Sequence, residues 1–144
     1  MDENFKLKSF KLKGLDAEVR YTISNDGCDA DYKVVLSKEI GSALYDSLDK
    51  MKAAASNILE LTEEQEKRIT ARGIVLSGTG ENVKAAIYCG YDTSAGTITF
   101  RTPRIAYKSA ESEAAAIITA ALPKIEQSVY DFLHNDTEEL EPIC

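Results

Sequence analysis

One order of apolar patterns occurs twice along the 144 residues, and this repetition constrains the fold more than any single motif does. In each copy, three short runs with the alternation of a β-strand precede one long run with the helical period of about 3.6 residues. The first copy covers about residues 5–59 and the second about residues 69–134. The sequence therefore predicts a single α+β domain over residues 1–134. It should contain two β-β-β-α units, with six mainly antiparallel strands and two long helices packed on the sheet.

The first strand, residues 5–13, consists of the tetrapeptide Phe-Lys-Leu-Lys written twice with one serine between the copies. Side chains alternate between the two faces of a strand, so regular geometry would place Phe5 and Phe10 on opposite faces. Ser9 therefore marks either a β-bulge or the true start of the strand.

Two further strands complete the first copy. The apolar residues from Leu15 to Ile23 alternate with polar ones, which is typical of a strand with one buried face. The Asn-Asp-Gly sequence at 25–27 predicts a hairpin into a third strand over 28–36, because these residues accept the positive φ that such turns need.

A helix is expected after each set of strands. The first should run over 38–59, with Ser37 as its N-cap and an apolar stripe at helical spacing. The second should run over 109–134, where Pro123 predicts a kink or a break because proline removes one helical hydrogen bond. The polar segment 60–68 is expected to connect the two copies.

The second copy begins with a strand near 69–78 that is apolar on both faces, and this pattern favours a central position in the sheet. The next two strands, near 83–91 and 97–101, alternate more regularly. Pro103 ends the last strand or places it at a sheet edge, because proline cannot donate a hydrogen bond to a neighbouring strand.

Composition indicates a protein with its own apolar core. Hydrophobic residues make up 44% of the chain, which is enough to fill a core without disulfides or a metal. No apolar run is long enough to cross a bilayer, and residues 1–13 lack the continuous apolar stretch of a secretory signal. A cytoplasmic protein that does not bind membranes is therefore expected.

The net charge of −7 is concentrated near the C-terminus. Residues 111–144 carry eight acidic residues and one lysine, whereas the other 110 residues carry sixteen charges of each sign. We interpret the acidic residues as a solvated helix face followed by a flexible acidic tail at 135–144. The alternative is an acidic patch that imitates a phosphate backbone and occupies a nucleic-acid-binding partner.

The sequence indicates neither a metal site nor a catalytic group. Cys28, Cys89 and Cys144 are widely spaced, and His134 is the only histidine, so the clustered ligands of a zinc site are absent. A nucleophile needs a base within reach, and no such pair can be identified. We therefore expect a non-enzymatic protein without a cofactor.

The densest cationic group lies just before the second helix. Arg101, Arg104 and Lys108, with Tyr107 among them, should lie near the free amide groups at the N-terminus of that helix, close to Ser109. Guanidinium groups beside such amides predict a site for phosphate or a nucleotide. The alternative is a set of surface cations that balance the acidic helix.

The N-terminal strand predicts a second kind of anion site. Lys6, Lys8 and Lys11 would contact a phosphate backbone while Phe10 stacks on a base, as in proteins that bind single-stranded nucleic acid. In the alternative, Phe10 belongs to the core and the lysines face water, where they also discourage aggregation.

Four segments of the chain together carry a resemblance to other proteins. They are Val-Val-Leu-Ser-Lys-Glu-Ile at 34–40, Ile-Thr-Ala-Arg-Gly-Ile-Val-Leu-Ser-Gly at 69–78, Ala-Ala-Ile-Tyr-Cys-Gly at 85–90 and Phe-Arg-Thr-Pro-Arg-Ile at 100–105. With their glycines and the Thr-Pro pair, they resemble a group of small uncharacterised α+β proteins encoded by bacteriophages and prophages. The resemblance covers about residues 31–134. It implies a genetic setting and the cytosol of a host cell, and it assigns no catalytic residue.

The sequence as a whole predicts a binding protein. Our leading hypothesis is a non-enzymatic accessory protein of a phage or mobile element that acts on a host or phage protein, or on nucleic-acid transactions. The alternatives are a small-ligand protein that binds a phosphate-bearing nucleotide near Arg101, and a single-stranded nucleic-acid binder. An open sheet also leaves unpaired edges through which copies of the chain can form a homo-oligomer.

Overall fold

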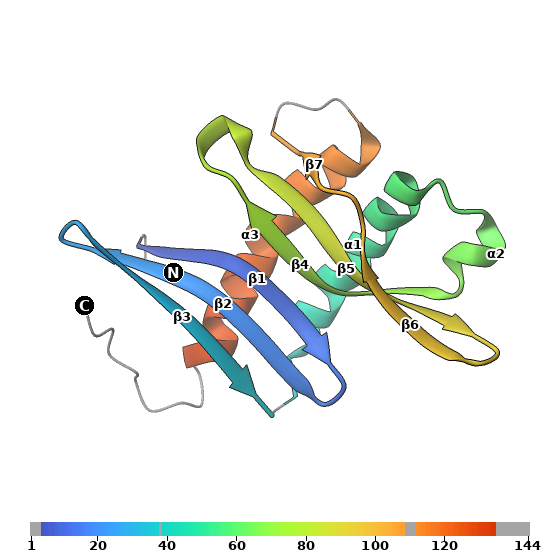
Figure 1. The fold of residues 1–144 in the computed structure, drawn as a ribbon, viewed down its shortest axis with the longest axis horizontal. Helices are drawn as coiled ribbons and strands as arrows, with labels where there is room; N and C mark the ends of the chain where they lie inside the picture. Colours follow the sequence, from blue (N-terminus) through green and yellow to red (C-terminus); the bar gives the residue numbers. More distant parts are fainter. Residues whose placement is uncertain (1–3, 38, 109–111, 135–144) are drawn as a thin grey trace.

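The structure is a computed structural model that describes residues 4–37, 39–108 and 112–134. Seven strands form one sheet in which every pairing is antiparallel, and two long helices pack on one of its faces (Figure 1). The predicted α+β class with two β-β-β-α units is confirmed. The predicted acidic tail at 135–144 and the residues around Ser109 lie outside the described residues.

The two units meet at the middle of the sheet. The first unit consists of β1 (Phe5–Lys13), β2 (Asp16–Asn25), β3 (Cys28–Leu36) and α1 (Ser42–Leu59). The second consists of β4 (Ile69–Ser77), β5 (Lys84–Thr93), β6 (Gly96–Arg101) and α3 (Glu113–His134). The strand order is β3-β2-β1-β4-β5-β6, so the strand that is apolar on both faces does lie at the centre.

Three short elements were not predicted from the sequence. They are α2 (Glu63–Glu66), the 3-10 turn η1 (Gly80–Asn82) and β7 (Ile105–Ala106), which pairs with β5 beyond the end of β6. α2 forms within the connecting segment because Thr62 and Gln65 cap each other: each side chain accepts a hydrogen bond from the backbone amide of the other.

A β-bulge determines which face each side chain of β1 occupies. The register between β1 and β2 shifts between Leu7 and Ser9, so Lys8 is the extra residue. The bulge turns Phe10 to the same face as Phe5, and both side chains are buried. Of the two interpretations of Ser9, the bulge is the one observed.

The second unit has the same irregularity at the equivalent place. The register between β4 and β5 shifts between Ala71 and Gly73, so Arg72 is the extra residue. Arg72 lies 64 positions after Lys8. The shared position of the bulges shows that the two units correspond strand by strand.

β1 and β4 join the two units through a short antiparallel pairing, which we call the seam. It consists of residues 9–11 opposite residues 73–75, with Phe10 facing Ile74. Phe10 and Ile74 are also 64 positions apart, so equivalent residues face each other and the units are related by a local two-fold axis. A Cβ atom at Gly73 would overlap the carbonyl oxygen of Phe10, so the strands approach this closely because position 73 has no side chain.

The helices bury their apolar stripes against the inner face of the sheet and against each other. Phe10, Ile74 and Ile87 from three central strands are fully buried. The ring of Phe10 meets that of Phe132 on α3 edge-on, with 6.4 Å between the ring centres. Leu15 was expected in this core, but it is 95% exposed because β2 begins only at Asp16 and Leu15 belongs to the preceding turn.

The first helix begins later than the sequence predicted. α1 starts at Ser42 with Gly41 as its N-cap, so both the start at residue 38 and the assignment of Ser37 as the cap are wrong. The hydroxyl of Ser37 instead donates to Asp16 Oδ1 over 2.7 Å, which ties the end of β3 to the start of β2. Ile40 is buried, so the segment before the helix already belongs to the core.

α3 runs without interruption through Pro123, so a break at this residue is not observed. Proline cannot donate to the carbonyl of Thr119, and its ring is exposed, so replacing it costs little packing. We expect Pro123→Ala to stabilise the protein by about 1–3 kcal/mol. The measurement is the urea midpoint at unchanged m-value. Lys124→Ala, on the same exposed turn, should leave the midpoint nearly unchanged, and a lower midpoint for Pro123→Ala would contradict the prediction.

Candidate functional site

The face of the sheet opposite the helices is the candidate functional surface. α1 and α3 lie behind the sheet in Figure 1, and their buried side chains pack on its inner face. Neither long helix covers the outer face of strands β1 to β6. We call this outer face the open face.

The open face carries an excess of positive charge. Among the described residues, the strand register places nine lysines and arginines on it and five acidic residues. The basic residues are Lys6, Lys8, Lys11, Lys13, Arg20, Lys33, Arg72, Lys84 and Arg101, and the acidic residues are Asp16, Glu18, Asp29, Asp31 and Asp92. On the other side of the molecule, described α3 has three acidic residues and one lysine. The two sides of the molecule therefore differ in the sign of their charge.

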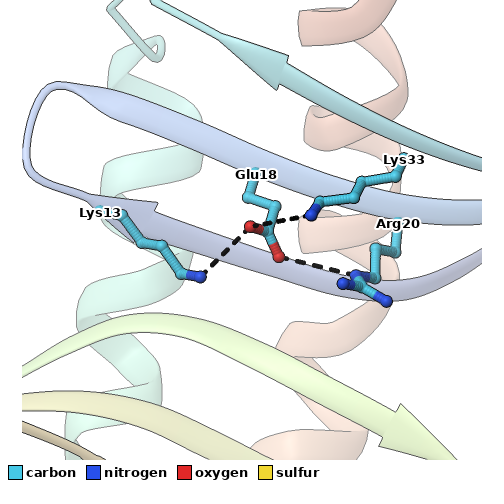
Figure 2. A network of polar contacts seen from close by, with 4 residues as sticks. All are labelled: Lys13, Glu18, Arg20 and Lys33. Carbon is cyan, nitrogen blue, oxygen red and sulfur yellow. Dashed lines mark hydrogen bonds and ion pairs between the residues drawn. The ribbon is translucent and has the colours of Figure 1, made fainter.

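Glu18 lies at the centre of three of these cations. Its carboxylate is 3.2 Å from Lys13 Nζ, 3.6 Å from Arg20 Nε and 4.0 Å from Lys33 Nζ (Figure 2). The side chain of Glu18 is only 11% exposed, whereas each of the three cations is about half exposed. One buried carboxylate therefore holds three cations from β1, β2 and β3 together, and an excess positive charge remains at the surface.

The environment of Glu18 favours its ionised form. Burial raises the pKa of Glu18, but the hydrogen bond from Lys13 and the charges of Lys13 and Lys33 lower it by more, so the pKa lies below its ordinary value of 4.5. A carboxylate with a lowered folded-state pKa stabilises the protein above its ordinary pKa, and this stabilisation is lost as the carboxylate is protonated at lower pH.

We expect the pH dependence of stability to change in Glu18→Gln. As the pH falls from about 6 through the ordinary pKa of Glu18 and below it, the wild-type protein should lose more stability than the variant, because only the wild-type protein can protonate this group. Urea midpoints measured at a series of pH values give the comparison. Parallel profiles for the two proteins would show that the carboxylate is not stabilised by its cations.

A row of paired residues extends the cationic surface across the seam. Lys11 of β1 lies opposite Gly73 of β4, Gly73 lies opposite Tyr88 of β5, and Tyr88 pairs with Arg101 of β6. Lys11 Nζ is 5.7 Å from the centre of the Tyr88 ring, within cation–π range. The absence of a side chain at Gly73 lets Lys11 and Tyr88 meet above it.

Lys11 also lies within the electrostatic range of cations from both units. Burial lowers the pKa of Lys11, the charge of Lys13 lowers it further, and Arg101 and Arg20 add to this effect against the opposing charge of Glu18. The repulsion between these like charges in the free protein decreases when an anion binds between them. This cluster of Lys11, Lys13, Arg20 and Arg101 is therefore a candidate site for an anion.

Three of the four residues predicted to bind a nucleic-acid strand lie on the open face, and the fourth does not. Lys6 and Lys8 are exposed, and Lys8 Nζ lies 3.3 Å from Asp31 Oδ1. Phe10 is fully buried, so its ring cannot stack on a base, and the bulge at Lys8 is the reason. Tyr88 provides an aromatic ring on the open face instead.

The four residues predicted for a phosphate site are spread along the chain from the end of β6 to the residues after β7. Arg101 of β6 pairs with Tyr88, and Ala106 of β7, two positions before Lys108, pairs with Lys84, so these two pairings lie about 13 Å apart along β5. Arg101 belongs to the open face, and Arg104 is exposed in the loop between the strands.

Tyr107 and Lys108 lie towards α3, away from the open face. Burial raises the pKa of Tyr107, and the charge of Glu126 raises it further. Burial also raises the pKa of Glu126, against the opposing charge of Lys108. Tyr107 and Lys108 therefore both lie within electrostatic range of Glu126 on α3.

Two amides of the first turn of α3 are already engaged by protein side chains. Asn57 Oδ1 accepts from the amide of Ala114 over 3.2 Å, and Ser112 Oγ accepts from the amide of Ala115 over 3.1 Å. Glu113 places a negative charge at the same turn. The N-terminus of α3 therefore has fewer free amide groups for a phosphate than the sequence predicts, and Glu113 adds a repelling charge.

The described part of the chain offers no metal site, membrane-spanning helix or reactive thiol beside the open face. Within residues 4–37, 39–108 and 112–134, no three His, Cys, Asp or Glu side chains are placed to hold a metal ion. No described helix is long and apolar enough to span a membrane. Cys89 is buried, and burial raises the pKa of its thiol to about 12, so this thiol is neutral and shielded.

Sequence reasoning missed the grouping of Glu18, Arg20 and Lys33 and the position of Tyr88. The alternation along each strand did place Glu18 and Arg20 on an outer face. The missing information was the pairing of β1 with β4, which puts Lys11 and Arg101 on one surface. No local signal in the sequence specifies that long-range pairing.

Comparisons with known proteins give no assignment. No protein-family model matches the sequence, and no curated protein or solved structure matches it either. The open face is therefore interpreted from its geometry and charge.

Proposed function

We propose that this protein binds single-stranded nucleic acid on the open face of its sheet. The observation that carries the proposal is the cationic cluster around Lys11, to which β1, β2 and β6 each contribute on a face that the long helices leave uncovered. A phosphate backbone has the complementary charge, and the counterions released on binding favour association at low salt.

The shape of the face favours a single strand over a duplex. Six strands spaced about 4.8 Å apart make a surface about 24 Å wide. This surface is wider than the major groove of B-DNA, which is about 12 Å across and admits a helix or a two-stranded ribbon. A single strand can instead lie across the sheet, where Tyr88 offers a ring to an unpaired base.

The resemblance of residues 31–134 to phage and prophage proteins supports a role in the nucleic-acid transactions of a phage or mobile element, in the cytosol of its host. The role is one of binding without catalysis. Capture of a nucleotide at Arg101, Arg104 and Lys108 receives less support, because Lys108 lies near the acidic Glu126 of α3 and two amides at the N-terminus of that helix already bind protein groups.

The test is the binding of a fluorescein-labelled oligothymidylate of about 12 nucleotides, followed by fluorescence anisotropy. We expect the logarithm of the affinity to fall linearly with the logarithm of the salt concentration, with a slope of about −3 if four phosphates are contacted. A duplex of the same length should bind more weakly. If no oligonucleotide binds at low salt, the proposal is wrong, and an acidic protein surface becomes the better partner for this face.

A further inference from the structure

A pocket of about 320 Å³ opens at one end of the seam. Residues from the end of β1, the start of β4 and one side of α1 line it. Its apolar wall includes Leu12, Leu48 and Ile69, and its polar wall includes Asp49, Lys52 and Arg72. The ring of Tyr45, a residue that is 55% exposed, also lines it.

The pocket exists because β1 and β4 stop pairing. The last paired residues of the seam are Lys11 and Gly73, and the bulge at Arg72 ends the ladder there. Beyond this point the two strands diverge, and α1 lies behind the space between them (Figure 1). The β1–β4 pairing therefore does not extend over the strand segments that line the pocket.

The pocket connects the open face with the helix layer. Arg72 lies over Gly90 on the open face, since a Cβ atom at Gly90 would come within 2.6 Å of Arg72 Nε. Arg72 and Thr70 line the pocket from the sheet side, whereas Asp49 and Lys52 line it from α1. A group that enters the pocket therefore remains next to the cationic surface.

We infer that this pocket binds one nucleotide unit, with the base inside and its phosphate at the cationic rim. The volume lies at the lower end of the range of about 300–1,000 Å³ for ligand pockets, which suits a ligand of this size. The apolar wall and the Tyr45 ring suit the faces of a base, and the hydroxyl of Thr70 suits its polar edge. Lys52 and Arg72 outweigh Asp49, so the rim attracts a phosphate. Asp49 can accept a hydrogen bond from an amino group of a base or from a ribose hydroxyl.

The inference rests on the proposed function and extends it, because the base can come from a strand that lies on the open face. A free mononucleotide offers the same chemistry. The two sources are distinguished by comparing strands with and without bases and by testing nucleotides separately.

The first experiment compares a labelled oligothymidylate with a strand of the same length built from abasic spacers. The open face should bind both, because both carry the phosphate backbone. The pocket should make the strand with bases bind about tenfold more tightly, a difference of the size that base–aromatic contacts give. Failure of both strands to bind would overturn the proposed function, whereas equal binding of both would overturn only the use of the pocket by a strand.

The second experiment uses a matched pair of variants on α1. Lys52 lines the pocket, and Lys50 is an exposed lysine of the same helix that does not line it. Lys52→Glu should reduce the preference for the strand with bases to the part that Tyr88 provides, and Lys50→Glu should retain it in full although the net charge changes equally. Tyr45→Ala should reduce the preference without changing the binding of the abasic strand.

The third experiment measures thermal shifts with AMP, GMP, CMP and UMP, with inorganic phosphate as the reference. A higher midpoint with a nucleotide than with phosphate, lost in Lys52→Glu and kept in Lys50→Glu, identifies the pocket as a site for free nucleotides. If no nucleotide shifts the midpoint and the strands with and without bases bind equally, the inference is wrong.

Discussion

Gly73→Ala should lower the melting temperature by about 10 °C or more, because it forces a side chain into the seam. The added Cβ would overlap the carbonyl oxygen of Phe10 and crowd the backbone of Lys11, and backbone in the middle of a sheet cannot move aside. The strands must separate, which weakens the pairing that joins the two units. A loss of about 3 kcal/mol or more is expected, which is large for a single methyl group.

Gly41→Ala is the matched control for this substitution. A Cβ atom at Gly41 meets no neighbouring atom, and Gly41 lies before α1 and outside the sheet. Differential scanning calorimetry of the three proteins gives the comparison. If Gly73→Ala melts within about 2 °C of the wild type, the seam tolerates a side chain and the close approach of β1 and β4 is not essential.

The double variant Lys11→Glu, Arg101→Glu should bind oligothymidylate about 100-fold more weakly than the wild type at moderate salt. Each substitution removes a cation from the row across the seam and adds a repelling charge, so the salt dependence should also become shallower by about 0.7 per lost phosphate contact. Neither residue is one of the three cations that pair with Glu18 in Figure 2, although Lys11 lies opposite Glu18 in the register of β1 and β2.

The control for the double variant is Lys50→Glu, Lys124→Glu, which changes the net charge equally. Both lysines are exposed on the helices, away from the open face. Their replacement should alter the affinity only slightly, because charges beyond the Debye length of about 10 Å are screened. Equal losses in the two double variants would mean that net charge governs binding, and the open face would then not be the site. Circular dichroism confirms that both proteins are folded.

Much of the architecture follows from local patterns that the sequence displays. The alternation from Ala17 to Ile23 and the Asn-Asp-Gly turn predict a hairpin, and the structure has positive φ at both Asp26 and Gly27 as such a turn requires. The helical stripe that includes Leu44, Leu48 and Met51 is buried as expected. These features depend on neighbours within a few residues, so they can be predicted from the sequence.

The features that the sequence could not supply depend on contacts between distant residues. Serine is a residue type that favours N-caps, but the hydroxyl of Ser37 donates instead to the carboxylate of Asp16, 21 positions earlier. The bulge at Lys8 is selected because it puts Phe10 against Phe132 in the core. The candidate surface depends on the pairing of β1 with β4, which no turn specifies because β2, β3, α1 and α2 lie between these strands in the sequence.

The two-fold relation at the seam gives the fold the geometry of a homodimer within one chain. Two identical half-chains joined edge to edge would form an isologous interface, and every feature at one end would recur at the other. In a single polypeptide the two halves can differ in sequence, so the two ends of the seam need not be identical. At one end Phe5 now packs its ring against Tyr21 and Tyr130, while the corresponding space at the other end is the pocket beside Tyr45. Duplication thus allows one half of a symmetric scaffold to provide packing while the other half is free to acquire a ligand.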